Sequence, residues 1–297
     1  MPSWQGRSKG SALGYSIFVT IIKKAGIPTA YLLLRIVAFY YYLFSYRSSK
    51  IIFDFYHRKL KYGVPVSLYK LYRNYYLLGQ TLIDKIAIMS GEGNRYTFNF
   101  DGEENLRAIT SLKKGGLLLS GHIGNWEIAG YLLKRLNTRI NIVMFDGEHQ
   151  KIKEYLTSIT GKNTANIIVI KNDISHIFEI AEALRNNELV CMHADRFVEG
   201  NKTIVSDFLG ERANFPLGPF LLAAKFKVPV AYVFAMKENT FHYHFFSTDV
   251  KVYPAYDKDE LISQMLKDFT KEMENKVKAY PEQWFNYYDF WQKKNLG

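Results

Sequence analysis

The chain has 297 residues, of which 48% are hydrophobic, so it is long enough for one large α/β domain or for a domain with an appendage. Its single cysteine, Cys191, excludes an intrachain disulfide and fits a reducing, cytoplasmic environment, and no secretory cleavage pattern is visible. The formal net charge of +11 fits nucleic acid, an anionic membrane surface or acidic partners. Because the sequence has no zinc-finger spacing, basic heptad region or RNA-binding aromatic signature, nucleic acid is the weakest of these partners.

The most apolar part of the chain lies near its start, at Ile27–Tyr46. About twenty such residues are long enough to cross a bilayer core, but Arg35 in the middle would be costly there. Three interpretations stay open: a membrane span, a helix lying in the membrane interface, and an ordinary core helix. The first two predict a membrane-anchoring helical segment over residues 1–50, followed by a main domain with a helical cover over residues 51–297.

Residues 48–90 show helical spacing of their apolar side chains, interrupted at Gly63–Pro65, and are predicted to cover one side of the main domain. A short alternating strand at Tyr96–Phe100 and an acidic helix at Glu103–Leu112 follow. Phe241–Ser247 is expected to add a hairpin strand at the sheet edge, and apolar residues spaced by four predict a last helix over Leu261–Val277.

Between these segments, strands and helices alternate. The predicted strands are Leu117–Ser120, Ile140–Phe145, Ile167–Ile170, Leu189–His193 and Val228–Met236. The predicted helices are Trp126–Leu136, His149–Ser158, Ile174–Arg185 and Leu217–Phe226. This alternation predicts an α/β fold with a mostly parallel central sheet flanked by helices on both faces.

The stretch from Ser120 to Glu127 combines a strand end, a glycine turn and a helix start, with Asn125 as a plausible N-cap. Such junctions are where α/β folds place their ligands. His122 leaves the strand end, and Glu127 follows five residues later, as a base and its orienter would. The competing interpretation is an ordinary polar pair with no catalytic role.

A second group of candidates follows the strand Leu189–His193. Asp195 and Arg196 stand just beyond its carboxyl end, where a local ion pair and turn is the simpler interpretation, and His193 is predicted to be a packed strand residue. Downstream, the loop around Gly210 leads to a helix start whose free N–H groups suit an anion. Three further candidates lie there: Arg212, Pro216 and Gly218.

Other chemistries find little support. The sequence shows no Walker loop, dinucleotide fingerprint or serine-hydrolase elbow, and no cluster with metal-ligand spacing. His242 and His244 alternate on a strand and are expected to point to one solvent-facing side.

In several of these segments, the chain resembles the late acyltransferases of lipid A biosynthesis, within the wider glycerolipid acyltransferase superfamily. Gly121–Glu127 resembles the family signature, in which a histidine and an acidic residue five positions later form the catalytic pair. Met192–Asp195, Phe208–Gly210 and Phe215–Gly218 resemble a second characteristic region, and Tyr280–Trp284 resembles the terminal Pro-x-Gln-Trp block. The apolar start of the chain resembles the family's membrane anchor.

The resemblance implies a glycerolipid acyltransferase-like fold and a site at the cytoplasmic face of a bacterial inner membrane. It implies catalysis by His122 and Glu127 and substrate binding by Asn125, Asp195, Arg196, Gly210, Arg212, Pro216 and Gly218. No cofactor or metal is expected. The donor would be an acyl carrier protein or acyl-CoA, and the acceptor a hydroxyl of a lipid A-like or other amphipathic lipid. The backbone of the Gly121–Asn125 turn or a basic side chain would stabilise the oxyanion.

Two segments depart from the family pattern and leave the acceptor open: Phe145–His149 and Phe285–Phe290. Two other functions also stay open at this stage. A non-catalytic protein that binds anionic membranes would use the same basic and aromatic surface. A lipid or thioester hydrolase would use His122 to activate water instead of an acceptor.

Overall fold

The computed structural model describes residues 12–89, 91–126, 128, 136, 138–145, 166–171, 173–198, 200–254 and 257–291. The predicted helix at His149–Ser158 and most of the one at Trp126–Leu136 lie outside these residues, as does the segment Asp146–His149.

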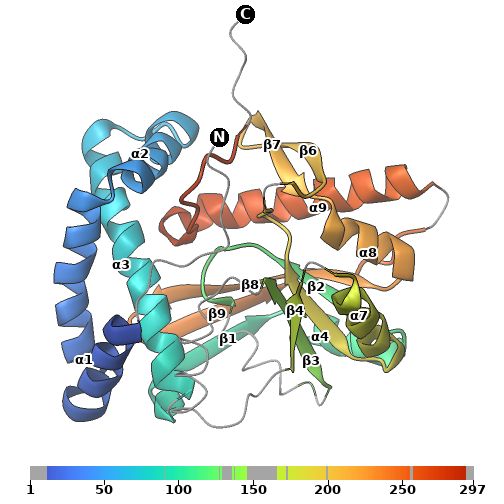
Figure 1. The fold of residues 1–297 in the computed structure, drawn as a ribbon, viewed down its shortest axis with the longest axis horizontal. Coiled ribbons are helices and arrows are strands. Elements are labelled where there is room, and N and C mark those ends of the chain that lie inside the picture. Colours follow the sequence, from blue (N-terminus) through green and yellow to red (C-terminus); the bar gives the residue numbers. More distant parts are fainter. Residues whose placement is uncertain are drawn as a thin grey trace, which may run out of the picture.

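A seven-stranded sheet forms the centre of the molecule, with strand order β1-β9-β8-β2-β5-β3-β4 (Figure 1). The strands are β1 Thr97–Asp101, β2 Gly116–Ser120, β3 Ile140–Phe145, β4 Asn166–Ile170, β5 Leu189–His193, β8 Val230–Asn239 and β9 His242–Ser247. Neighbouring strands run parallel except for β8 and β9. The predicted mostly parallel sheet is therefore confirmed. Strand β2 lies in its middle and is buried along its whole length, which explains its unbroken aliphatic sequence.

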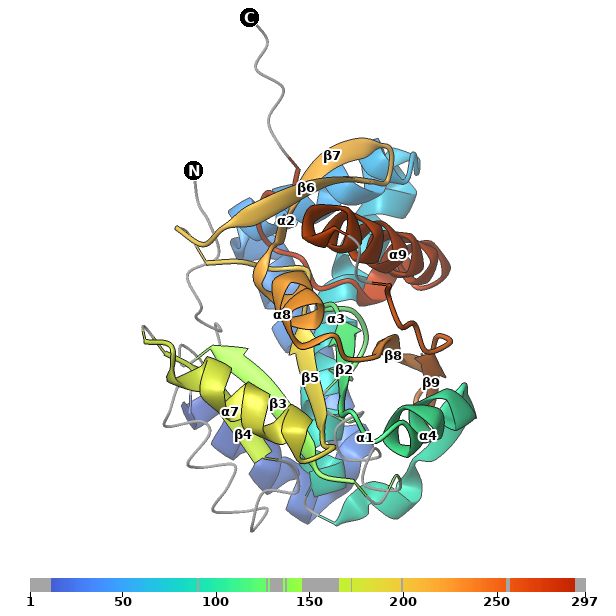
Figure 2. The ribbon, with the colours of Figure 1, turned by 90° about the vertical axis from the view of Figure 1, so that its right-hand side faces the viewer.

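Helices cover both faces of this sheet, as predicted. On the face of Leu118, the helix α4 Glu103–Ser111 buries Leu106 and Ile109. The opposite face, to which Leu117 and Leu119 point, shares a core with the helices α7 Ser175–Arg185, α8 Gly218–Phe226 and α9 Lys258–Ala279 (Figure 2). The two faces follow from the alternation of side chains along a strand.

Two strand predictions need correction. β9 is not the edge strand, because β1 pairs in parallel with its outer side. The segment from Thr203 to Pro216, which was not expected to form strands, is an antiparallel ribbon of β6 Thr203–Phe208 and β7 Glu211–Pro216. Its two-residue turn, Leu209 and Gly210, has φ values of 50° and 80°, as a tight hairpin requires.

An N-terminal layer of helices stands at one end of the sheet (Figure 1). It consists of α1 Ala12–Phe44, α2 Tyr46–Asp54, the π-helix Phe55–Lys59, α3 Val64–Met89 and the short 3-10 helix Glu92–Arg95. The break expected at Gly63–Pro65 falls where α3 begins. Helices α1 and α3 pack so closely that a Cβ on Gly79 would lie 2.2 Å from Cδ1 of Leu34.

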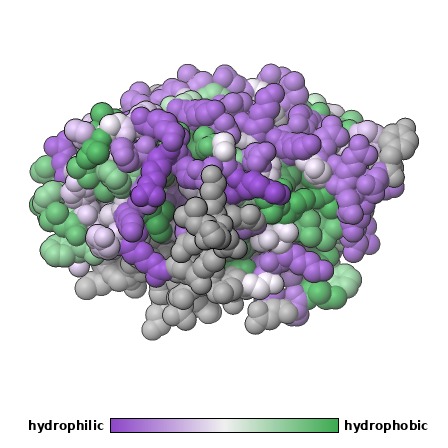
Figure 3. All heavy atoms as spheres, turned by 90° about the horizontal axis from the view of Figure 1, so that it is seen from above, coloured by the Kyte–Doolittle hydropathy of each residue, from purple (hydrophilic) through white to green (hydrophobic). Residues whose placement is uncertain are grey.

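Helix α1 has two different faces. One packs into the protein and buries Ile27, Tyr31 and Leu34. The other exposes large apolar side chains: Leu32, Ile36, Phe39, Tyr40, Leu43 and Phe44. Figure 3 shows hydrophobic residues at the end of the molecule where α1 and α2 lie. The segment Ser16–Phe44 is long and apolar enough to cross a membrane, with 33% of its most apolar window buried.

Candidate active site

The parallel pairing of β2 and β5 brings two distant loops together. Ser120, the last residue of β2, is in register with His193, the last residue of β5. His122 and Asp195 each follow two residues later, so both stand just beyond the same edge of the sheet. The carboxyl ends of parallel strands are the usual place for a site in such folds.

His122 and Asp195 meet in a two-point contact. His122 Nδ1 lies 2.7 Å from Asp195 Oδ1, and the backbone N–H of His122 donates to Asp195 Oδ2 over 2.8 Å. The Asp195 side chain is 1% exposed, whereas that of His122 is 20% exposed. The carboxylate is therefore sealed behind an imidazole that still reaches solvent.

The carboxyl group of Asp195 is held in its ionised form. Burial by itself would raise its pKa, but the attraction of His122 and the hydrogen bond from it lower the pKa well below the usual range. An ionised carboxylate beside Nδ1 places the imidazole proton on that nitrogen, because the carboxylate only accepts. In that tautomer the other nitrogen, Nε2, carries the lone pair that can accept a proton.

His193 packs directly on this pair. Its ring stacks on that of His122, with centroids 4.1 Å apart and planes 25° apart, and the edge of Trp126 meets it at 4.6 Å. Desolvation by burial and the positive charge of a protonated His122 hold the pKa of His193 well below its ordinary value. His193 therefore provides a neutral platform, in line with its predicted role as a packed strand residue.

The same three residues are close enough to be considered as metal ligands, since their donor atoms all lie within 4.8 Å of one another. Their orientation argues against this. The lone pairs of an imidazole lie in its ring plane, so two rings stacked at 25° do not converge on one ion. In addition, both oxygens of Asp195 already accept hydrogen bonds from His122. The arrangement fits a base with its orienter.

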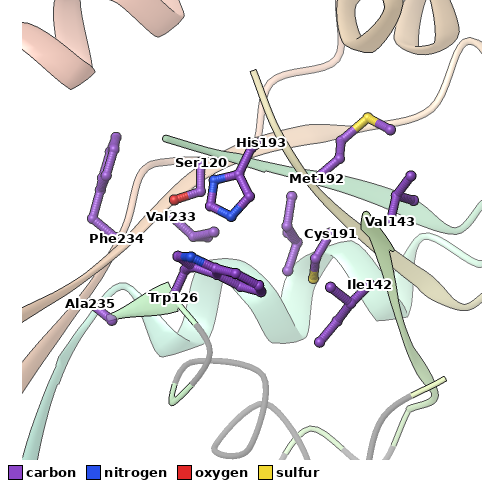
Figure 4. Close-up of a pocket in the computed structure, with 11 residues that line it drawn as sticks. Ser120, Trp126, Ile142, Val143, Cys191, Met192, His193, Val233, Phe234 and Ala235 are labelled. Carbon is purple, nitrogen blue, oxygen red and sulfur yellow. The ribbon is translucent and has the colours of Figure 1, made fainter. Parts of the chain in front are cut away.

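An apolar pocket opens beside His193 and Trp126 (Figure 4). Strands β2, β3, β5 and β8 line it with mostly hydrophobic side chains, among them Leu118, Ile142, Cys191 and Val233. Burial raises the pKa of the Cys191 thiol to about 12, so this cysteine stays protonated and acts as an apolar wall residue.

Comparison with known proteins identifies the family. The profile of the bacterial lipid A biosynthesis acyltransferases matches residues 72–293, most of the chain. The chain belongs to this family. Its family is therefore one of acyltransferases, as the sequence resemblance predicted.

The acyltransferase is also 30% identical over 129 residues to the phosphatidylinositol mannoside acyltransferases of two Mycobacterium tuberculosis strains, ATCC 25618 / H37Rv and CDC 1551 / Oshkosh. The alignment covers 42% of this chain and 39% of each relative, so the chain matches about two fifths of their length. Among solved structures, the 1-acyl-sn-glycerophosphate acyltransferase PlsC of Thermotoga maritima compares with a TM-score of 0.41 and 14% identity, over 84% of this chain and 96% of that one.

The structure describes only one of the two residues that the resemblance assigned to the catalytic pair. His122 stands at the strand end as expected. Glu127 lies outside the described residues. Among the residues that the structure describes, the carboxylate that contacts His122 is that of Asp195, which the resemblance assigned to substrate binding.

Asn125 and Arg196 lie next to the pair but turn toward the protein. The amide of Asn125 is buried and donates to the carbonyl of Thr81 at 3.0 Å and to the hydroxyl of Tyr243 at 3.3 Å. Asn125 therefore ties the turn to α3 and β9. Arg196 donates to the carbonyl of Phe285 and lies near the ring of Tyr288, in the C-terminal segment.

The remaining four candidates belong to the ribbon and the helix after it. Gly210 is in the hairpin turn, and Arg212 is exposed on β7 opposite Asp207. Pro216 ends β7, and Gly218 begins α8, so the predicted helix start is confirmed. The ribbon packs on α9, and it is Asp195 rather than any of these residues that the structure places against His122.

The histidines on β9 do share a side, but they are mostly shielded from solvent. His244 lies 3.1 Å from both Glu238 and Asp101, and the Nε2 of His242 lies 3.6 Å from Glu238. Their side chains are 16% and 17% exposed, so the expectation of a solvent-facing pair is wrong.

Proposed function

We propose that this acyltransferase moves a fatty acyl chain from an acyl thioester to a hydroxyl group of an amphipathic lipid, with His122 as general base and Asp195 as its orienter. The observation that carries the proposal is the two-point contact between His122 and Asp195 at the carboxyl ends of two central strands. The mostly apolar lining of the pocket beside His193, which suits a hydrocarbon chain, supports it.

In the proposed reaction, Nε2 of His122 takes the proton of the acceptor hydroxyl as its oxygen attacks the thioester carbonyl. Asp195 accepts the hydrogen bond from Nδ1–H and, as a carboxylate, stabilises the imidazolium that forms. The tetrahedral intermediate then collapses, the carbon–sulfur bond breaks, and the leaving thiolate takes the proton that the imidazolium received from the acceptor hydroxyl. The new ester and the free thiol balance the reaction without a covalent enzyme intermediate.

Between His122 and Asn125, the turn has no backbone N–H group left to bind the oxyanion. Each of its four N–H groups already donates to an acceptor inside the protein. In chain order, the acceptors are a carboxylate oxygen of Asp195 and the carbonyls of Gly121, Gln283 and Ala235, at 2.8, 2.7, 2.9 and 2.7 Å. A basic side chain, the other source that the sequence suggests, is therefore favoured over these four N–H groups.

For the substrates, we propose an acyl carrier protein as donor and a sugar hydroxyl of a glycolipid as acceptor. The net charge of +11 suits an acidic carrier protein. The family and the phosphatidylinositol mannoside acyltransferases among the relatives support a glycolipid. Lipid A is one member of this class, and acyl-CoA is the other donor that the assay must include.

We further infer that the acyltransferase sits on an anionic membrane surface, at the cytoplasmic face of the inner membrane, through the exposed face of α1. The opposite face of α1 buries Tyr31, whose hydroxyl donates to Asp84 in the protein interior, and crossing the bilayer would break this contact. An in-plane helix keeps it and places only Ile36 and its exposed neighbours in lipid. Ile36→Glu should therefore weaken sedimentation with anionic vesicles, whereas Phe178→Glu, on the exposed side of α7, should not.

The central experiment compares the wild type and His122→Ala with labelled acyl carrier protein or acyl-CoA and extracted glycolipids as acceptors. We expect the variant to lose about two to four orders of magnitude in turnover, because it lacks the base. Turnover near that of the wild type would contradict the mechanism. Release of free fatty acid at the rate of transfer, without an acceptor, would instead support the hydrolase.

A further inference from the structure

The C-terminal block Pro281–Trp284 lies against the catalytic turn. After α9 ends, the 3-10 helix Pro281–Gln283 leads into an extended segment that pairs with the turn as a strand would. Gly124 donates to the carbonyl of Gln283, and Phe285 donates to the carbonyl of His122, each over 2.9 Å. The backbone of His122 is thus held by a segment more than 150 residues further along the chain.

The side chain of Gln283 ties this block to β8. It is buried, at 4% exposure, and both ends of its amide bond the backbone of Lys237. Gln283 Nε2 donates to the Lys237 carbonyl at 2.6 Å, and the Lys237 N–H donates to Gln283 Oε1 at 2.9 Å. The Gln283 side chain thus forms the same pair of hydrogen bonds that a backbone peptide group forms in a sheet. It does so near the end of β8, where the register with β9 is irregular.

Strand β8 also holds the turn directly. Asn125 donates to the carbonyl of Ala235 at 2.7 Å, and Gly124 forms a bridge with the same residue. The approach is so close that a Cβ on Gly124 would lie 2.1 Å from that carbonyl oxygen, and its φ of +68° also favours glycine. The turn thus forms hydrogen bonds with both β8 and the block, and the side chain of Gln283 connects the block to β8.

Helix α3 supports the block from its other side. Glu282 pairs with Lys70 at 2.9 Å and with Arg73 at 3.2 Å. The buried amide of Asn74 donates to the carbonyls of Glu282 and Trp284, both at 3.0 Å. The block is therefore fixed on both sides, and its position relative to the sheet is set by Gln283.

We propose that Gln283 is a positioning residue of the acyltransferase, which fixes the block against β8 so that the block holds His122 in contact with Asp195. The inference rests on the proposed role of His122. It gives a role to a glutamine of the terminal block that is buried and bonded to backbone atoms.

The test is Gln283→Glu, which keeps the shape of the side chain but replaces the donor to the Lys237 carbonyl with an acceptor. Displacement of reacting groups by about 1 Å can cost on the order of 100-fold in rate, so we expect kcat to fall roughly 10- to 100-fold with KM for the acyl donor little changed. The acid limb of the pH–rate profile should move to lower pH, because an imidazole that loses its carboxylate neighbour binds its proton less tightly. Gln264→Glu, on the exposed side of α9, is the matched control.

A folded Gln283→Glu variant with the kcat of the wild type would overturn the proposal. So would a lower kcat with an unmoved acid limb, since that result would indicate a general loss of structure. If Gln283→Glu does not fold, Gln283→Asn serves, because its shorter amide does not reach both atoms of Lys237. Activity of His122→Ala equal to the wild type would refute the proposed base itself, which is a separate result.

Discussion

Asp195 and Asp84 are both buried carboxylates, but they have different partners. Asp195 faces one imidazole, that of His122, which is partly exposed to solvent. Asp84 is completely buried and contacts other buried groups: the ammonium of Lys237 at 2.5 Å and the hydroxyls of Tyr31, Tyr96 and Tyr243.

These partners come from different parts of the fold. Tyr31 belongs to α1, Tyr243 to β9 and Lys237 to β8, so Asp84, on α3, joins the N-terminal layer to the sheet. Burial raises the pKa of Tyr243 well above its usual value, which keeps its hydroxyl protonated as a donor. The comparison indicates that burial alone does not distinguish the two carboxylates. Their partners do: a partly exposed imidazole for Asp195 and a buried ammonium for Asp84.

The largest expected effect is that of Asp195→Asn on catalysis. The asparagine amide carries no charge to stabilise the imidazolium, and it does not fix the tautomer with the proton on Nδ1. We therefore expect kcat to fall by about two to four orders of magnitude while the protein still folds. Steady-state turnover of the purified variant, with its thermal melting curve, measures this. Glu127→Gln is the comparison variant: a loss larger than that of Asp195→Asn would assign the orienting role to Glu127, as the family resemblance suggests.

For Asp84→Asn, we expect the main effect to be on stability. The variant leaves the Lys237 ammonium buried without its counter-charge, and breaking such a pair costs about 3–5 kcal/mol in the free energy of unfolding. Urea unfolding followed by circular dichroism measures it. Asp207→Asn, at an exposed position of β6, should change the free energy by less than about 0.5 kcal/mol. A stable Asp84→Asn variant with greatly reduced kcat would contradict the comparison.

The smallest effect is a dependence of stability on pH. Because the pKa of Asp195 is lowered in the folded protein, its contribution to stability is complete above the unfolded pKa, near 4, and is lost as the pH falls through the lower folded value. The difference in unfolding free energy between the wild type and Asp195→Asn should therefore shrink between pH 6 and pH 3. An unchanged difference over this range would show that the carboxylate has no lowered pKa.

Much of the fold was predictable because the central strands of the sheet are continuous runs of aliphatic residues. The bounds of β3 and β5 agree with the sequence prediction, since polar residues and turns mark their ends. The ribbon of β6 and β7 was missed, because its strands contain exposed and half-buried polar residues such as Asp207 and Asn214 instead of such a run.

The site was only half predictable. A histidine beyond a strand end stands out locally, but its partner Asp195 is 73 residues away and becomes a neighbour only through the register of β2 and β5. His122 and Asp195 each lie two residues beyond the end of their strand. With the knowledge that β2 and β5 are neighbours, this equal spacing would have predicted their contact. Gln283 gives no such signal, because it contacts backbone atoms, which every residue has.

The pocket wall gives this acyltransferase a built-in reporter. Cys191 is the only thiol of the chain, and it lines the pocket beside His193. A thiol-reactive dye therefore labels this one place without any engineered cysteine, and it does so slowly because the thiol stays protonated. A fatty chain lodged in the pocket would cover the sulfur, so the labelling rate would measure pocket occupancy during turnover.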